Sequence, residues 1–266
     1  MKNITIKEMA GSRALKIGHY VGEFITPGIG QILKAAGCDF VLLDMEHSGF
    51  SFDTIKSALR YMQAANLPTI VRAPSKEGHH ISRACDIGAE GIMLPMVNSA
   101  EEAKHNLQWI KYFPEGQRGI ALQIAHDRYQ PGPVVEKLAA ANRWTTLFAQ
   151  IETADGVKNA DAIAALDGVD CLWVGHLDLS CSLGIPGQFD HPAFTRAIEQ
   201  VVAACKRHNK SLGRLVPTVQ QGVEFFEMGF DFICYSGDIW VLYNTVTEAV
   251  TELRAKCKDK SKSTRR

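Results

Sequence analysis

The chain has 266 residues, 46% of them hydrophobic, and its 29 basic and 29 acidic side chains leave a formal net charge of zero. This composition is typical of a globular protein and excludes the basic surplus that binds nucleic acid or an anionic membrane. We therefore expect a small-molecule substrate and neither nucleic acid nor a membrane as a partner.

Eight short aliphatic or β-branched runs recur along the chain, each followed by a stretch with helical spacing. They lie at 15–21, 40–43, 69–72, 91–95, 147–151, 171–174, 212–216 and 232–235. Nearly continuous apolarity is typical of strands covered by helices on both faces, and the intervening helices favour parallel pairing. The pattern predicts a single α/β domain over 1–255, a closed (β/α)8 barrel, with an open doubly wound sheet as the alternative. A flexible basic tail is expected over 256–266.

Helix boundaries are marked between these runs. Ser99 and Thr218 are followed three residues later by Glu or Gln, which predicts helix starts, and Pro192 suits a first helical turn. Glycines that end helices are expected at Gly37, Gly88, Gly168 and Gly229. One irregular segment, 112–142, predicts helical insertions and loops over one end of the barrel, acting as a lid or a subunit contact.

The seven cysteines are scattered, with no CxxC pair. They predict reduced core thiols in a cytoplasmic protein. The first residues lack the apolar stretch of a signal peptide, and no run approaches the length of a membrane span. Neither export nor membrane insertion is expected.

In barrels of this kind the chemistry lies at the carboxyl ends of the strands. Glu152 and Asp178 end neighbouring strands, so they predict either a general acid and base or two ligands for Mg²⁺ or Mn²⁺. Capping of the next helix is the alternative role for Glu152. No predicted strand carries a lysine at its carboxyl end, which disfavours Schiff-base chemistry and favours a Lewis-acid metal.

Two basic side chains follow other strands. Arg72 lies before Ala-Pro74 and suits a carboxylate or a developing enolate oxygen; a structural salt bridge to Asp44 or Glu46 is the alternative. His47 is the natural proton carrier, because a free imidazole has a pKa of about 6.5; a solvated loop histidine without a role is the alternative.

At these same residues the sequence resembles the HpcH/HpaI family of metal-dependent class II pyruvate aldolases, which belongs to the phosphoenolpyruvate/pyruvate barrel superfamily. The resemblance covers roughly residues 15 to 250. The matching motifs are Phe40-Val-Leu-Leu-Asp-Met-Glu-His47, Ile70-Val-Arg-Ala-Pro74, Gly88-Ala-Glu-Gly-Ile-Met-Leu-Pro-Met96, Gln150-Ile-Glu-Thr153 and Val174-Gly-His-Leu-Asp-Leu-Ser180.

The resemblance implies reversible cleavage of a 4-hydroxy-2-oxo acid into pyruvate and an aldehyde. It also implies residue roles. A divalent metal, Mg²⁺ or Mn²⁺ with Co²⁺ or Zn²⁺ as further options, would be held by Glu152 and Asp178. Arg72 would stabilise the pyruvate enolate, and His47 would move the proton with Asp86 as its partner. The remaining pyruvate contacts would come from Gln150, Asp178 and the backbone around Gly175 and Leu177.

The sequence departs from the commoner family pattern at His176-Leu177 and at Arg214-Leu-Val-Pro-Thr218. Both segments would flank the aldehyde. The resemblance further implies a homohexamer, a trimer of dimers, in which a C-terminal helix packs on a neighbouring subunit. Two alternatives remain: another metal-enolate reaction, such as oxaloacetate decarboxylation or a citrate-synthase-like condensation, and a non-catalytic barrel that binds keto acids.

Overall fold

The computed structural model describes residues 4–257. Its strands are β1 (Lys16–Val21), β2 (Phe40–Asp44), β3 (Thr69–Arg72), β4 (Gly91–Leu94), β5 (Thr146–Ile151), β6 (Val169–Val174), β7 (Ser211–Val216) and β8 (Phe232–Gly237). All neighbouring pairs are parallel, and β8 pairs with β1 to close the barrel. The predicted (β/α)8 fold is confirmed, and each predicted strand lies within two residues of its expected bounds.

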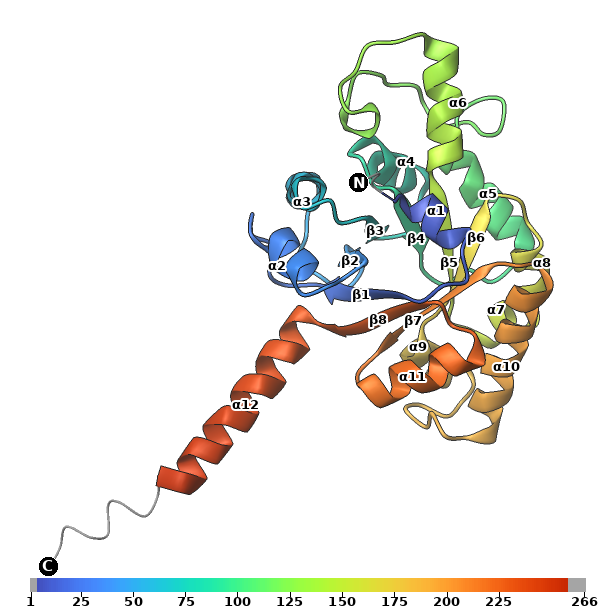
Figure 1. The fold of residues 1–266 in the computed structure, drawn as a ribbon. Helices are drawn as coiled ribbons and strands as arrows, with labels where there is room; N and C mark the ends of the chain where they lie inside the picture. Colours follow the sequence, from blue (N-terminus) through green and yellow to red (C-terminus); the bar gives the residue numbers. More distant parts are fainter. Residues whose placement is uncertain (1–3, 258–266) are drawn as a thin grey trace, which may run out of the picture.

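Helices surround the barrel (Figure 1). They are α1 (Ile6–Ala10), α2 (Ile29–Ala35), α3 (Phe52–Ala64), α4 (Gly78–Asp86), α5 (Ala100–Ile110), α6 (Val134–Trp144), α7 (Ala154–Lys158), α8 (Ala160–Ala164), α9 (His176–Ser182), α10 (Pro192–Arg207), α11 (Val219–Met228) and α12 (Asp238–Cys257), with a short 3-10 turn η1 (Ala125–Asp127). Ser99 and Thr218 cap α5 and α11, and Pro192 begins α10, as predicted. The four glycines expected to end helices all have positive φ.

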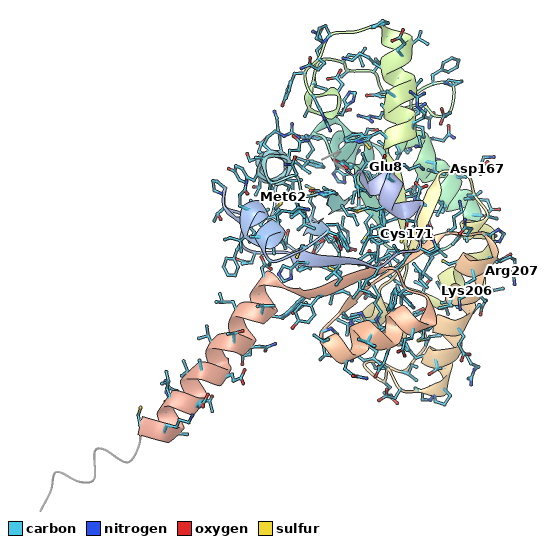
Figure 2. All side chains as sticks on the ribbon, in the orientation of Figure 1. Glu8, Met62, Asp167, Cys171, Lys206 and Arg207 are labelled. Carbon is cyan, nitrogen blue, oxygen red and sulfur yellow. The ribbon has the colours of Figure 1, made fainter. Side chains whose placement is uncertain are left out.

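The apolar core has two layers. One lies between the strands and the helices, and the other fills the barrel interior, where Phe40, Phe148 and Phe232 meet edge to face at centroid distances of 5.2 Å. Cys171 belongs to the interior layer, whereas Lys206 and Arg207 point outward from α10 (Figure 2). Four cysteines are buried, as expected of core thiols, but Cys181 and Cys257 are exposed.

Helix α1 closes the amino end of the barrel. Its Ile6 and Met9 pack against the interior layer. Lys16, at the start of β1, donates to the Met9 and Ser12 carbonyl oxygens at 3.1 and 2.6 Å and pairs with Asp231 at 3.3 Å. Since α1 plugs this end, the barrel interior is covered there by Ile6 and Met9.

The irregular segment 112–142 lies at the plugged end. It contains η1 and leads into α6, and residues of both line a pocket together with Thr5, Lys7 and Glu8 next to or within α1. The prediction of helical insertions over one barrel end is correct, but a lid over the active site is wrong. The reason is chain direction: α5 runs back from the carboxyl to the amino end of the sheet, so the segment that follows it begins there.

Helix α12 extends away from the barrel (Figure 1). It includes Lys256 and Cys257, which were expected in the basic tail, and the rest of that tail lies outside the described residues. Within residues 4–257, no helix has both the length and the apolarity needed to cross a membrane.

Candidate active site

A pocket of about 620 Å³ opens at the carboxyl ends of the strands. It is lined by Tyr20, Leu42, His47, Arg72, Met93, Gln150, Glu152, Trp173, Val174, Gly175, His176, Leu177, Asp178, Leu215, Pro217, Ser236, Ile239, Trp240 and Asn244. Seven of the eight predicted site residues are therefore brought together in one cavity. The exception is Asp86.

Arg72 is held rigidly by Asp44, its register partner on β2. Its Nε and Nη2 donate to the two Asp44 carboxylate oxygens at 2.7 and 2.8 Å, and the Tyr20 hydroxyl donates to the same carboxylate at 2.7 Å. Burial alone would raise the pKa of Asp44, but the hydrogen bonds and charge of Arg72 hold it below its usual value. The salt bridge considered as an alternative role for Arg72 is thus present, and the guanidinium still lines the pocket.

Glu46 faces both basic groups of the site. Its Oε2 lies 3.2 Å from Arg72 Nη1 and 3.7 Å from His47 Nε2. Burial raises the pKa of Glu46, and Arg72 and His47 oppose that rise. The His47 side chain is 63% exposed, which leaves the imidazole free to exchange protons at the mouth of the pocket.

Asp86 does not reach His47 within one chain. It is the last residue of α4, which brings it close to the amino end of the barrel, and its Oδ1 accepts from Arg118 Nε and Nη2 at 3.1 and 2.5 Å. The His47–Asp86 pair that the resemblance implies is not formed within a single subunit, where Asp86 pairs with Arg118.

Glu152 lies at the end of β5 and is 3% exposed. Its Oε2 accepts from the Met96 amide at 2.9 Å, and its Oε1 accepts from Gln150 Nε2 at 2.7 Å. Burial raises its pKa to about 7, with the Met96 hydrogen bond opposing and the charges of Glu46 and Asp178 adding to the rise. The alternative role of Glu152 as a helix cap is wrong, because the Thr153 side chain caps α7.

These groups fit a hard divalent cation. Negative charge from Glu152 and Asp178 converges on one pocket, and Gln150 Oε1 is buried without a hydrogen-bond partner. Across residues 4–257, no three His, Cys, Asp or Glu side chains form a ready metal cluster. Two carboxylates that leave positions for water and substrate oxygens are the kind of site Mg²⁺ and Mn²⁺ accept.

Gly175 makes room for Glu152. A Cβ atom at this position would lie 2.0 Å from Glu152 Oε1, although φ −92° and ψ 96° are open to any residue. The glycine is therefore required by the close approach of the carboxylate rather than by backbone strain.

The two segments that depart from the family pattern meet beside the pocket. The His176 pKa is lowered to about 4 by burial and by the charge of Arg214, so the imidazole is neutral at pH 7. Leu215 and Pro217 line the same wall as His176.

Several residues around the pocket lie outside the predicted set. The sequence assigns no role to Tyr20 and names Asp44 only as an alternative salt-bridge partner of Arg72, because the contacts among these residues depend on strand register, which places three chain segments together. Ser236, Trp240 and Asn244 come from the β8 end and α12, where the sequence shows only an apolar helical pattern.

Comparisons with known proteins agree with this geometry. A sequence profile described as HpcH/HpaI aldolase/citrate lyase matches residues 23–244. The chain is 33% identical over 222 residues to a 5-keto-4-deoxy-D-glucarate aldolase of Shigella boydii serotype 18, covering 84% of this chain and 85% of the relative. An HpcH/HpaI aldolase structure from Desulfitobacterium hafniense DCB-2 superimposes with a TM-score of 0.89 at 30% identity, covering 94% and 97% of the two chains. A structure of the citrate synthase SbnG superimposes with a TM-score of 0.84 at 25% sequence identity, covering 95% of this chain and 98% of that one. The chain belongs to the HpcH/HpaI aldolase/citrate lyase family, a family of carbon–carbon lyases.

Proposed function

We propose that the protein is a class II pyruvate aldolase that reversibly cleaves a 4-hydroxy-2-oxo acid into pyruvate and an aldehyde. The observation that carries the proposal is the convergence of Glu152, Asp178 and Arg72 on one pocket at the open end of the barrel. The relatives named 5-keto-4-deoxy-D-glucarate aldolase support the same reaction class.

Glu152 and Asp178 would hold a divalent cation, Mg²⁺ or Mn²⁺ in the first instance and Co²⁺ or Zn²⁺ as further options. When bound, such an ion supplies a Lewis acid beside the keto oxygen of pyruvate. Gln150 and the backbone at Gly175 and Leu177 orient the keto acid.

Arg72 stabilises the negative charge that develops on the enolate oxygen. Its guanidinium is fixed by Asp44 before substrate arrives, so little reorganisation accompanies the reaction. His47 takes the proton from carbon and returns it. The assignment of Asp86 as the partner of His47 remains a prediction, and it requires a second copy of the chain to bring Asp86 to the pocket.

Exchange of the pyruvate methyl protons in heavy water tests the enolate step without an aldehyde. We expect exchange with Mg²⁺ or Mn²⁺, loss of exchange with excess EDTA, and loss of metal-dependent exchange in Glu152→Gln, which keeps the shape of the side chain but removes its charge. Exchange that persists undiminished in EDTA would rule the proposal out.

A citrate-synthase-like condensation is the second candidate, because the chain also resembles the citrate synthase SbnG. A retro-aldol screen over 4-hydroxy-2-oxo acids of different length, coupled to lactate dehydrogenase, separates the two. Release of pyruvate from at least one of these acids is expected of an aldolase, whereas condensation chemistry consumes oxaloacetate instead.

The enzyme would work as a homo-oligomer, with a hexamer built as a trimer of dimers as the specific proposal. The support is the exposed apolar surface of α12, which the barrel of its own chain leaves uncovered.

A further inference from the structure

Trp240 adds an aromatic ring to the active-site pocket from the first turn of α12. Its indole stacks on the phenol ring of Tyr20, with ring centroids 5.3 Å apart and planes inclined by 23°. Asn244 lines the same pocket one helical turn further along, so one face of α12 is turned toward the strand ends. Trp240 is 44% exposed, so burial in the core does not explain a ring of this size here.

The Tyr20 ring lies in a narrow slot. Gly237 is its register partner on β8, and a Cβ there would lie 2.7 Å from Tyr20 Cδ1 and 2.8 Å from Trp240 Cε3. A Cβ at Gly22 would lie 2.6 Å from the Tyr20 hydroxyl oxygen. The two glycines and the indole therefore confine the phenol ring, which is only 7% exposed.

The orientation of this phenol matters because its hydroxyl reaches the carboxylate that holds Arg72. The hydroxyl donates to Asp44 Oδ2 at 2.7 Å, and the same oxygen accepts from Arg72 Nη2 at 2.8 Å. Burial raises the pKa of Tyr20 and the charge of Asp44 raises it further, so the phenol stays protonated and remains a donor. A continuous line of contacts thus joins Trp240 on α12 to the guanidinium at the end of β3.

We propose that Trp240 is a positioning residue for Arg72, the group that stabilises the enolate. Its indole holds Tyr20 in place, and the Tyr20 hydroxyl together with Asp44 sets the direction of the guanidinium. The inference rests on the proposed aldolase function and adds a residue of α12 to its enolate step. Because a donor stabilises developing charge only if it is already in place, loss of the stack should slow enolate formation without weakening pyruvate binding.

Pyruvate methyl exchange with saturating Mn²⁺ tests this role. Trp240→Leu keeps an apolar side chain but removes the ring, and we expect kcat for exchange to fall about tenfold with KM for pyruvate unchanged. Trp240→Phe keeps a ring that can stack, so it should retain most of the wild-type kcat. The matched control is Val241→Ala in the same helical turn. Val241 is exposed and lies outside the pocket lining, so its replacement should leave kcat unchanged.

A double-mutant cycle shows whether Trp240 acts through the Tyr20 hydroxyl. Tyr20→Phe alone should lower kcat by a similar factor, and adding Trp240→Leu to it should lower kcat further by only about twofold or less. Losses that multiply in the double variant would overturn the inference. A rise in KM for pyruvate at unchanged kcat would do so as well, because it would indicate a binding contact instead. Wild-type kcat in Tyr20→Phe would overturn it even if Trp240→Leu failed to fold.

The wild type separates this inference from the aldolase proposal. Metal-dependent exchange in the wild type with the same kcat in Trp240→Leu overturns only the role of Trp240. No exchange in the wild type overturns the aldolase proposal and this inference with it.

Discussion

At the scale of single residues, Asp44 connects the two basic groups of the site. Its carboxylate accepts from the Arg72 guanidinium, the Tyr20 hydroxyl and the Glu46 and His47 amides. Asp44→Asn removes the charge that balances a buried arginine, so we expect a loss of about 3–5 kcal/mol in stability. Urea denaturation measures it, and methyl exchange should slow about a hundredfold or more because Arg72 is no longer fixed.

Tyr20→Phe is the matched control for Asp44. It removes one of the hydrogen bonds to the same carboxylate and should cost only about 1 kcal/mol. We expect the stability loss to depend mainly on the negative charge that balances Arg72. Equal losses of stability in Asp44→Asn and Tyr20→Phe would contradict this, because they would show that the number of hydrogen bonds to Asp44 matters more.

Gly175→Ala tests how closely Glu152 must approach the strand. Its Cβ would meet Glu152 Oε1 at 2.0 Å, so the carboxylate must turn away from its position beside Gln150. We expect the Mn²⁺ concentration for half-maximal exchange to rise about tenfold or more, because changes to the groups that orient a metal ligand typically weaken metal binding by about this factor. Titration of exchange against Mn²⁺ measures the shift.

Gly222→Ala serves as the control for Gly175. Gly222 lies in α11, and a Cβ there meets only the Ile233 and Val216 side chains at ordinary contact distances of 3.4 and 3.6 Å. The protein should therefore gain up to about 1 kcal/mol of stability and keep its metal requirement. An unchanged metal titration in Gly175→Ala would remove Glu152 from the proposed ligand set.

Residue types at strand ends predict only part of the site. Glu152 and Arg72 could be selected because each directly ends an apolar run, whereas the role of Gln150 came from the resemblance. The role of Tyr20 could not, since it depends on the register that sets β1 against β2. The His47–Asp86 pairing came from a resemblance alone, and a single chain keeps the two residues apart.

At the scale of elements, Asp238 fastens the start of α12 to the loop after β1. Its carboxylate accepts from the amides of Gly22, Glu23 and Phe24 at 3.1, 3.0 and 2.7 Å. Asp238→Ala removes all three acceptors, so the amides of 22–24 should exchange with solvent about tenfold faster or more. Hydrogen exchange resolved to this loop measures the effect.

Asp53→Ala is the control for the Asp238 prediction. Asp53 also lies in a first helical turn, that of α3, where the Ser51 side chain provides the cap. Its replacement should leave exchange in the 22–24 loop unchanged. Equal exchange in the wild type and Asp238→Ala would show that Tyr20 stacking on Trp240, at 5.3 Å, holds the loop without Asp238.

Element order was predictable to a greater extent than the placement of insertions. Apolar runs and helix-ending glycines carry local signals, so the eight strands and the ends of α4 and α11 follow from sequence. The barrel end covered by residues 112–142 has no local signal, because it follows from the direction of α5 in the assembled barrel.

At the scale of the whole molecule, α12 is anchored to the barrel at its start, and the described part of the chain leaves most of its surface uncovered. None of its twenty residues is buried. A stripe of exposed apolar side chains runs along it, formed by Ile239, Leu242, Val246, Val250 and Leu253. These positions recur at spacings of three and four, which places them on one helix face. An apolar stripe of this length marks an interface rather than a solvated surface.

The occupant we expect is a second copy of the chain, so light scattering should give a mass at least twice the 29.3 kDa of one chain. Val246→Lys with Leu253→Lys places two charges on the stripe and should shift the mass toward the monomer, because lysine ammonium groups are costly to bury without an anion. Glu248→Lys adds positive charge on the opposite face of the same helix and should leave the mass unchanged.

If Asp86 reaches His47 only across such an interface, the double variant should also lose methyl exchange, whereas a monomer with full exchange would place the entire proton relay within one chain.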